Sequence, residues 1–254
     1  MINKLWTDLS YYYILERELS ISVLADSKKW ENFYRSKVLR ILRKSGYFDD
    51  LIENCTDEKE ENKVILEELN VYANPSYVYF KGNGKITFQN GNEISITPEI
   101  PLALSSACIK EITDFEITDT KIMTVENLTS FNRIKEAGTF YIFLSGYHNS
   151  AKQNFIKKIH SQNPEREYLH FGDIDPDGFY ILQNLRTKTN INFKPYKMGI
   201  AQLEKYSSFA KPLEQNDQKK ARALKEKNLF PEIIDCMLKT NQKLEQEIIS
   251  WKEM

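Results

Sequence analysis

The spacing of hydrophobic positions changes along the chain and divides it into two parts. From about Thr7 to Lys44, apolar residues recur every three or four positions, which predicts helices, and a charged helix is expected at about 54–70. Alternation with a period of two follows in Tyr77–Lys81, Lys85–Gln89 and Glu93–Thr97. Asn-Gly turns separate these runs, as in β-hairpins. Residues 1–117 are therefore expected to form a small α+β module that contacts DNA or a partner, and a winged-helix-like arrangement is one architecture that fits.

The remaining residues, 118–254, alternate between strand and helix patterns. Strands are expected at Lys121–Val125, Thr139–Leu144, Glu167–Phe171 and, at an edge, Asn192–Tyr196. Helices are expected at Leu128–Ala137, Ser150–Ser161, Gly178–Arg186 and from about Lys219 onward. This alternation predicts an α/β domain built on a Rossmann-like parallel sheet with right-handed crossovers.

Composition narrows the class of protein. The 254 residues are 41% hydrophobic and 28% charged, with a formal net charge of -1, which argues against a uniformly basic nucleic-acid binder. The start of the chain turns polar at once, and no apolar run approaches the roughly 20 residues that span a bilayer. Cys55, Cys108 and Cys236 lie far apart, so a disulfide framework or a zinc site is not expected. A cytoplasmic protein with reduced cysteines is the expectation.

One helical segment concentrates positive charge. Between Lys28 and Lys44 a single acid, Glu31, accompanies seven basic residues, which are Lys28, Lys29, Arg35, Lys37, Arg40, Arg43 and Lys44. A basic amphipathic helix can lie on a phosphate backbone. An ordinary solvated helix face is the alternative, and the sequence does not decide between them.

The run from Tyr168 to Gly178, YLHFGDIDPDG, carries the clearest chemistry. Asp173, Asp175 and Asp177 follow one expected strand, and Glu126 follows another. Because the carboxyl ends of parallel strands meet at one edge of a sheet, these acids are expected at a common site. Carboxylate oxygens suit Mg²⁺ or Mn²⁺ rather than zinc. The pattern thus predicts metal-assisted phosphoryl transfer.

Two other interpretations of this run are weaker. The first half of an EF-hand calcium loop fits, but the twelfth position is Asn184 instead of glutamate, a strand precedes the loop, and Pro176 lies within it. A simple helix cap would account for Asp177 alone and would leave Asp173 and Asp175 unexplained.

The same residues carry a family resemblance. VEN at 125–127, followed by GDIDPDGF at 172–179, resembles the Toprim domain of type II topoisomerases, primases and related nucleases. The residues of these motifs, together with KLEQEII at 243–249, are similar to those of the JetD family of Wadjet anti-plasmid nucleases. That family is related to the topoisomerase VI A subunit. The resemblance covers residues 120–251. It implies a Toprim fold and a metal-dependent endonuclease that cleaves double-stranded plasmid DNA in prokaryotic defence, beside an SMC-type complex and as a homodimer.

The resemblance also assigns roles to individual residues. Glu126 matches the Toprim acid, a general acid/base or metal ligand, and Asp173 and Asp175 match the paired metal ligands. The resemblance further implies that Asp177 is a peripheral third ligand and that Glu245 and Glu247 form a second metal site. Asn127 would orient Glu126 or a phosphate, and Lys152 would contact a phosphate. For Lys152 a solvated helix position is the alternative.

The chain also departs from the family. Only about 115 residues precede the Toprim-like part, which puts binding to a motor complex in doubt. Topoisomerase VI-type enzymes use a tyrosine nucleophile, for which Tyr11, Tyr12, Tyr13 and Tyr34 are available without a mark of activation, so water is the expected nucleophile. A topoisomerase VI A-like enzyme and a non-catalytic DNA-binding subunit remain the alternatives. The three histidines, His148, His160 and His170, lack ligand spacing.

Overall fold

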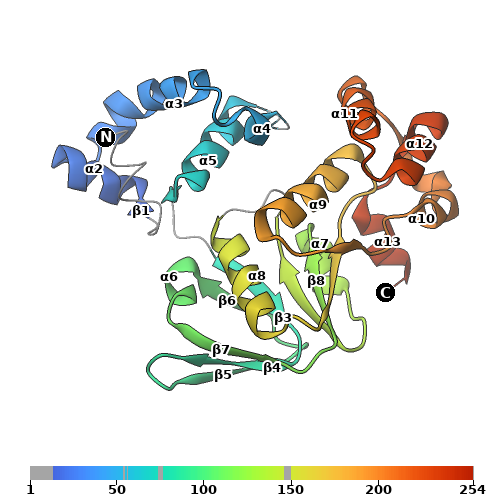
Figure 1. Cartoon of the computed structure of the whole chain (residues 1–254), viewed down its shortest axis with the longest axis horizontal. Helices are drawn as coiled ribbons and strands as arrows, with labels where there is room; N and C mark the ends of the chain where they lie inside the picture. The colour runs from blue at the N-terminus through green and yellow to red at the C-terminus, as the bar shows by residue number, and fades with distance from the viewer. Residues whose placement is uncertain (1–13, 54, 56, 74–76, 146–149, 254) are drawn as a thin grey trace. The chain divides into compact units, whose positions relative to one another are not determined.

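A computed structural model describes residues 14–53, 55, 57–73, 77–145 and 150–253 (Figure 1). The chain forms two compact units. The first runs to Tyr77 and includes short segments near Ser105 and Ala151, and the second holds most of the remaining chain. Both α-helices and a sheet with parallel and antiparallel strands are present, so the fold is mixed α/β, as expected.

The first unit is helical. Its elements are β1 (Ile14–Leu15), α2 (Glu16–Leu24), the helical turn η1 (Trp30–Tyr34), α3 (Arg35–Lys44), α4 (Asp49–Ile52), α5 (Glu58–Glu68) and β2 (Val71–Tyr72), with β1 parallel to β2. Trp30, Leu39 and Ile65 are central to its core. The helical pattern of 14–44 is interrupted because Ala25 has a left-handed φ of 52° and the Asp26 carboxylate accepts hydrogen bonds from the next backbone N–H groups.

A six-stranded sheet organises the second unit. Its order is β11 (Lys194–Pro195), β10 (Glu167–Phe171), β8 (Lys121–Val125), β9 (Thr139–Phe143), β3 (Tyr77–Lys81) and β6 (Leu102–Ser105). The strands from β11 to β9 are mutually parallel, which confirms the parallel core of the predicted sheet. Strand β3 pairs antiparallel with β9, so the sheet is mixed.

Of the two expected hairpins, the one between β4 (Gly84–Phe88) and β5 (Glu93–Ile96) forms and belongs to this second unit, whereas β3 pairs with β9 instead of β4. Strands β4, β5 and β7 (Ile112–Ile117) form a separate antiparallel sheet in the order β5-β4-β7. Because the backbone of β3 hydrogen-bonds with β9, the hairpin region continues the α/β sheet instead of the N-terminal helices. The units therefore divide near Tyr77 and not between residues 117 and 118.

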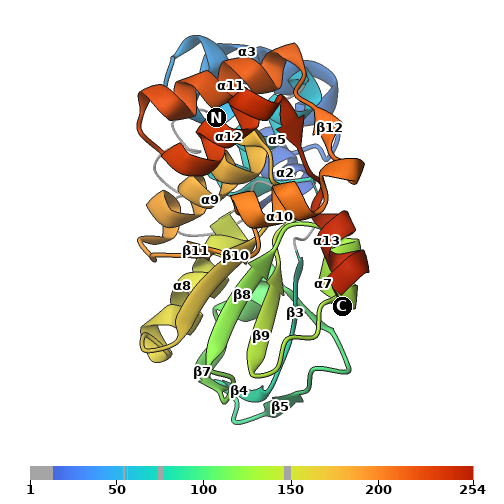
Figure 2. The ribbon, with the colours of Figure 1, turned by 90° about the vertical axis from the view of Figure 1, so that its right-hand side faces the viewer.

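Helices cover both faces of the six-stranded sheet. On one face Phe155 of α8 (Ser150–Gln162) packs on Phe80, with ring centroids 5.2 Å apart. On the other, Phe131 of α7 (Leu128–Arg133) packs on Phe143 at 5.9 Å, and Figure 2 shows the two helices on opposite sides. The short helix α6 (Ser106–Ile109) precedes β7.

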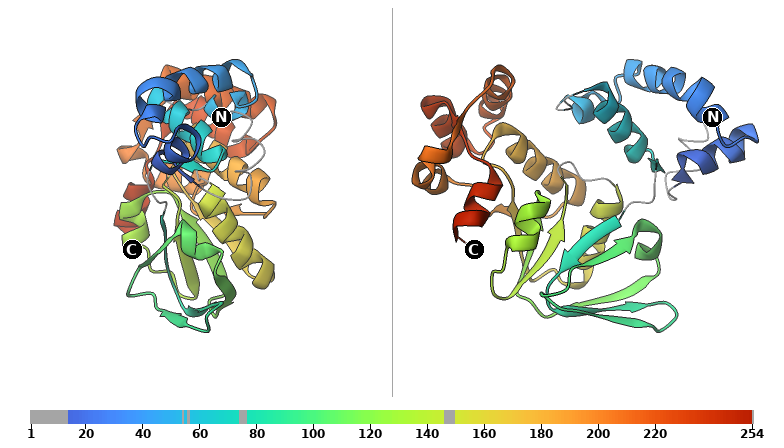
Figure 3. Two further views of the ribbon diagram at one scale, coloured as in Figure 1. Left: turned by 90° about the vertical axis from the view of Figure 1, so that its left-hand side faces the viewer. Right: turned by 180° about the vertical axis from the view of Figure 1, so that it is seen from behind.

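The C-terminal part of the second unit is mainly helical and is drawn from two further sides in Figure 3. It contains α9 (Pro176–Thr189), α10 (Ile200–Lys205), the short turn η2 (Ser207–Phe209), α11 (Gln215–Glu226), α12 (Pro231–Thr240) and α13 (Gln246–Glu253). Two-residue strands β12 (Lys211–Pro212) and β13 (Gln242–Lys243) pair antiparallel. None of the helices in the described part of the chain has the length and apolar character to cross a membrane.

Candidate acidic centre

Two neighbouring parallel strands bring the predicted acids together. Strands β8 and β10 pair in register, with Val125 opposite Phe171. The Glu126 backbone N–H donates to the Phe171 carbonyl over 3.0 Å, so the chain after β8 leaves the sheet beside the chain after β10. Glu126 and the segment that begins at Asp173 therefore lie at the same sheet edge, as the sequence predicts for these strand ends.

A second backbone contact adds the C-terminal acids to this edge. Ile174 and Leu244 form an antiparallel bridge with backbone hydrogen bonds of 2.9 and 3.0 Å. Both side chains are buried. Since side chains alternate along extended backbone, the flanking residues Asp173 and Asp175 share the opposite face, across from Glu245 and Lys243. This pairing was not predicted, because helices were expected from about Lys219 onward.

Helix α13 begins against these acids. The Gln246 backbone N–H donates to Asp173 Oδ1 over 2.6 Å, and its side-chain Nε2 donates to the Phe171 carbonyl over 2.9 Å. Gln246 Oε1 accepts from the Asn127 N–H over 3.0 Å, and the Asn127 side chain donates to the Glu247 carboxylate. Asn127 Oδ1 also accepts from the first turn of α7 and so caps that helix.

The third aspartate has a different role from the first two. Asp175, not Asp177, is the N-cap of α9, since its Oδ1 accepts from the Gly178 N–H over 2.7 Å and Pro176 starts the helix. Both Asp177 oxygens accept from Lys220 Nζ, over 2.7 and 2.9 Å. The interpretation of Asp177 as helix cap is therefore wrong, because its carboxylate ties α9 to α11.

The acids are electrostatically coupled. Burial, reinforced by the charges of Asp173, Asp175 and Asp177, raises the pKa of Glu126 well above its usual value. Burial and the Asp175 charge raise the pKa of Asp173 to about 7, although the Gln246 N–H works against this shift. Burial also raises the pKa of Asp175 to about 6, opposed by the Gly178 N–H and by Lys243. Such buried carboxylates favour a cation or protons among them.

The side chains of the acidic centre suit a metal ion in their chemistry but not in their placement. Their chemistry fits, because the donors are all oxygen and the buried Glu126 Oε2 has no hydrogen-bond partner. Their present placement does not, because no three His, Cys, Asp or Glu side chains in the described ranges are positioned to hold a metal ion. Asp173 and Asp175 instead each accept from a backbone N–H. Coordination at this edge would require side-chain rotation.

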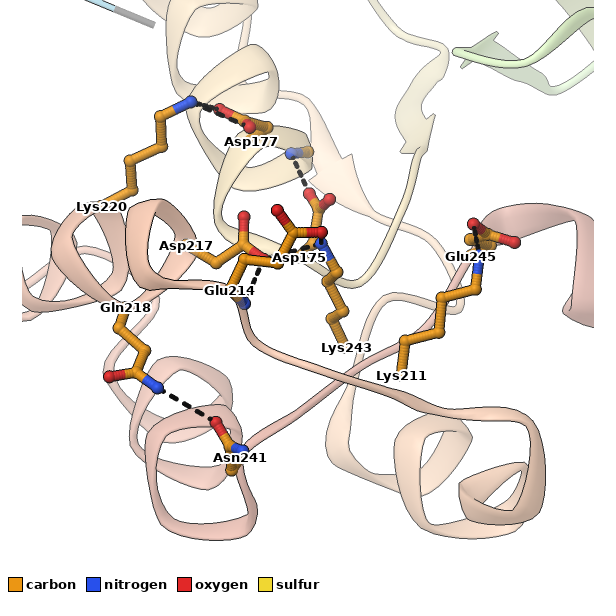
Figure 4. Close-up of polar contacts among 11 residues, drawn as sticks. Asp175, Asp177, Lys211, Glu214, Asp217, Gln218, Lys220, Asn241, Lys243 and Glu245 are labelled. Atoms are coloured by element: carbon orange, nitrogen blue, oxygen red, sulfur yellow. Dashed lines mark hydrogen bonds and ion pairs between the residues drawn. The ribbon is translucent and has the colours of Figure 1, made fainter.

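Lysines surround the acids, and sequence reasoning missed most of them. Lys243 Nζ pairs with Asp217 Oδ2 over 2.6 Å, and Lys220 holds Asp177 (Figure 4). Exposed Glu245, the predicted second-site ligand, pairs with Lys211. The signal available in the sequence was the alternation of Lys243, Leu244 and Glu245, which is that of a short strand.

Other predicted site residues lie elsewhere. Lys152 is buried, donates to the Leu144 carbonyl, and lies 5.6 Å from the Phe143 ring centre, so it is not the solvated lysine of the alternative interpretation. His170 is fully buried on β10, where Nδ1 lies 2.9 Å from Thr124 Oγ1 and burial lowers the pKa to about 3. His160 packs edge-on against Tyr168. His148 and Tyr11 to Tyr13 lie outside the described residues.

The basic segment separates into paired and exposed residues. Arg35 pairs with Glu16 over 2.8 Å, and Arg43 pairs with Glu58 over 2.6 Å. Lys37, Arg40 and Lys44 are exposed on α3. We call these three residues the α3 basic face. Lys28 and Lys29, the other two basic residues of the predicted contact, are exposed and precede η1.

Comparisons with known proteins agree with this arrangement of motifs. The family model described as "Wadjet protein JetD, C-terminal" matches residues 89–254. The curated Wadjet protein JetD of Bacillus cereus (strain Q1) is 27% identical over 245 residues, which cover 93% of this chain and 57% of that protein. The chain thus spans little more than half the length of this relative. The match confirms the expected resemblance, and the chain belongs to the family defined by the C-terminal region of Wadjet protein JetD.

Proposed function

We propose that this chain is a Mg²⁺- or Mn²⁺-dependent endonuclease of Toprim type that cleaves double-stranded DNA in anti-plasmid defence. The observation that carries the proposal is the meeting of Glu126 with Asp173 and Asp175 at the ends of adjacent parallel strands. The relative's name, Wadjet protein JetD, supports the defence role. An SMC-type complex and a second copy of the chain are its proposed partners, since cutting two strands calls for two sites.

The residues divide the work as follows. Asp173 and Asp175 would hold the divalent ion, and Glu126 would complete its ligands or accept the proton of the attacking water. Glu247 and the exposed Glu245 could serve a second ion. When bound, a divalent ion supplies a more acidic water and stabilises charge on the scissile phosphate. Asn127 and Gln246 fix the strand ends from which these carboxylates project.

The α3 basic face is the proposed DNA contact. Lys37, Arg40 and Lys44 project from one exposed stretch of α3, next to Ile41, which is 52% exposed. Phosphate contacts of this kind supply affinity without sequence preference. That property suits an enzyme whose choice of DNA is made by shape or by a partner.

Plasmid cleavage by the full chain with Mg²⁺ or Mn²⁺ tests the proposal. Asp175→Asn keeps the Oδ1 that caps α9, and Glu126→Gln keeps the side-chain volume, so both remove charge with little change of fold. We expect each to lower the cleavage rate by about 100-fold or more. Asp235→Asn, at an exposed carboxylate paired with Lys225, is the control and should cleave like the wild type.

The alternatives give different results in the same assay. Cleavage that survives both substitutions unchanged would contradict the proposal. A protein–DNA adduct that persists after denaturing quench would favour a tyrosine nucleophile, as in topoisomerase VI-type enzymes. A wild type that binds DNA but neither cleaves it nor binds Mn²⁺ would indicate a DNA-binding subunit.

A further inference from the structure

Lys243 lies beside the acidic centre and has no part in the proposed hydrolysis. The Ile174–Leu244 bridge sets it across from Asp175. Its side chain is only 20% exposed, and Figure 4 shows it extending towards the carboxyl groups of Asp175 and Asp217. Its position is therefore set by the same backbone pairing that positions the predicted metal ligands.

A buried ion pair holds the ammonium group in place. Lys243 Nζ lies 2.6 Å from Asp217 Oδ2, and the Asp217 side chain is 10% exposed. Asp217 Oδ2 also accepts from the Glu214 N–H over 2.9 Å, at the start of α11. The carboxylate is thus fixed by a helix terminus, and it fixes the lysine in turn. By contrast, Lys225 on the same helix pairs with Asp235 where both side chains are more than half exposed.

Carboxylates surround the Lys243 ammonium group, with Asp217 Oδ2 at 2.6 Å, Glu214 Oε1 at 3.9 Å and Asp175 across the backbone bridge. Burial alone would lower the pKa of Lys243, but its hydrogen bond to Asp217 and the charges of Asp217, Asp175 and Glu214 outweigh burial and raise it. The positive charge of Lys243 in turn lowers the pKa of Asp175. Lysine is a compact charge with three donors and no lone pair when protonated, so it can neutralise a carboxylate without coordinating a metal ion.

We propose that Lys243 is a built-in counter-ion of the acidic centre, whose ammonium group, held by Asp217, balances Asp175 in the metal-free protein and opposes the binding of a divalent cation there. The first part concerns the metal-free chain and stands alone. The second part rests on the proposed function. Lys243 is a positioning residue in this scheme, since it acts through Asp175.

A double-mutant cycle in EDTA tests the first part. Thermal unfolding of the full chain is measured for Lys243→Met alone and in the Asp175→Asn background. Loss of the Asp217 partner is common to both backgrounds, so it cancels. We expect the fall in Tm to be at least twice as large with Asp175 as with Asn at that position. Equal falls overturn the counter-ion role. Lys225→Met, the control, should give the same change in both backgrounds.

Calorimetric titration with Mn²⁺ tests the second part. Removing one positive charge near the ligands should tighten Mn²⁺ binding by about tenfold in Lys243→Met, whereas Lys243→Arg should bind like the wild type. Unchanged affinity in Lys243→Met overturns the competition. Lys243→Gln, which keeps a donor for Asp217, repeats both measurements if the methionine variant does not fold. A wild type that binds no Mn²⁺ contradicts the proposed metal dependence, while the EDTA cycle still decides the counter-ion role.

Discussion

The carboxyl groups of Asp173 and Asp175 at the sheet edge lie in surroundings that disfavour their ionised form. Asp173 and Asp175 lie in a buried cluster whose members repel one another when ionised. Backbone N–H groups and lysines relieve part of this repulsion. A site that stores repulsion in this way gains stability when a proton or cation enters, and perturbed carboxylates of this kind gather at functional sites.

Burial, together with this repulsion, predicts how stability depends on pH. A carboxyl group whose pKa is higher in the folded than in the unfolded protein binds protons more tightly when folded, so stability is lost as pH rises through that interval. For Asp173 the interval runs from its ordinary 3.8 to about 7. Between pH 4 and pH 8 in EDTA, the wild type should therefore lose more stability than Asp173→Asn, by on the order of 4 kcal/mol.

Urea unfolding at several pH values measures this difference. Asparagine retains an oxygen that can accept from the Gln246 N–H, so the comparison isolates charge. Parallel pH profiles for the two proteins would show that folding does not raise the pKa of Asp173.

At the scale of elements, α13 closes the acidic centre by joining both strand ends. Gln246 is fully buried and bonds the chain after β8 and the end of β10 with the two ends of one amide. Its own backbone N–H, at the start of the helix, meets Asp173. The positive end of a helix dipole favours an anionic oxygen there. The last helix of the chain is thus part of the site as well as part of the core.

Removing the Gln246 amide should be costly. Gln246→Ala leaves the Phe171 carbonyl and the Asn127 N–H without these partners, so we expect a loss of about 2–4 kcal/mol in the free energy of unfolding. Gln218→Ala is a matched control at an exposed side-chain contact with Asn241 and should cost less than about 0.5 kcal/mol. Denaturant unfolding measures both variants. Similar small losses in the two would argue against the role of Gln246 in joining the two strand ends.

At the scale of the whole molecule, the acidic centre and the α3 basic face belong to different units. The acids belong to the second unit, and the α3 basic face belongs to the first. A nuclease needs both kinds of surface, since phosphates bind to cations while the proposed hydrolysis requires carboxylates.

DNA binding should report the α3 basic face through its salt dependence. The double variant Lys37→Gln/Arg40→Gln should weaken binding and lower the slope of log affinity against log salt by about 2. Lys59→Gln/Lys63→Gln changes net charge equally at exposed positions of α5 and is the control. Fluorescence anisotropy with a labelled duplex measures both, and identical slopes for the two variants would locate the DNA contact elsewhere.

The sequence alone determined those features that depend on local pattern. Periodicity predicted β3, β8 and β10 with their observed bounds. Strands β8 and β10 are buried on both faces and show as apolar runs, whereas β3 is exposed on one face and shows as an alternation. Strand-end logic also predicted that Glu126 would lie beside Asp173 and Asp175. The predicted end of α7 was wrong, because the helix ends at Arg133 and not at Ala137. Just after this end, the buried Lys81 Nζ donates to the Ile134 carbonyl.

Tertiary structure decided what depends on partners distant in sequence. The pairing of Ile174 with Leu244, the Gln246 bonds and the ion pair of Lys220 with Asp177 join positions that lie about 40 to 120 residues apart. The assignment of the hairpin region to the second unit likewise rests on the β3–β9 ladder. Local propensity carries no information about such contacts. The residue types of the acidic centre could therefore be predicted from the sequence, whereas its counter-charges and its closure by α13 emerged only from the folded chain.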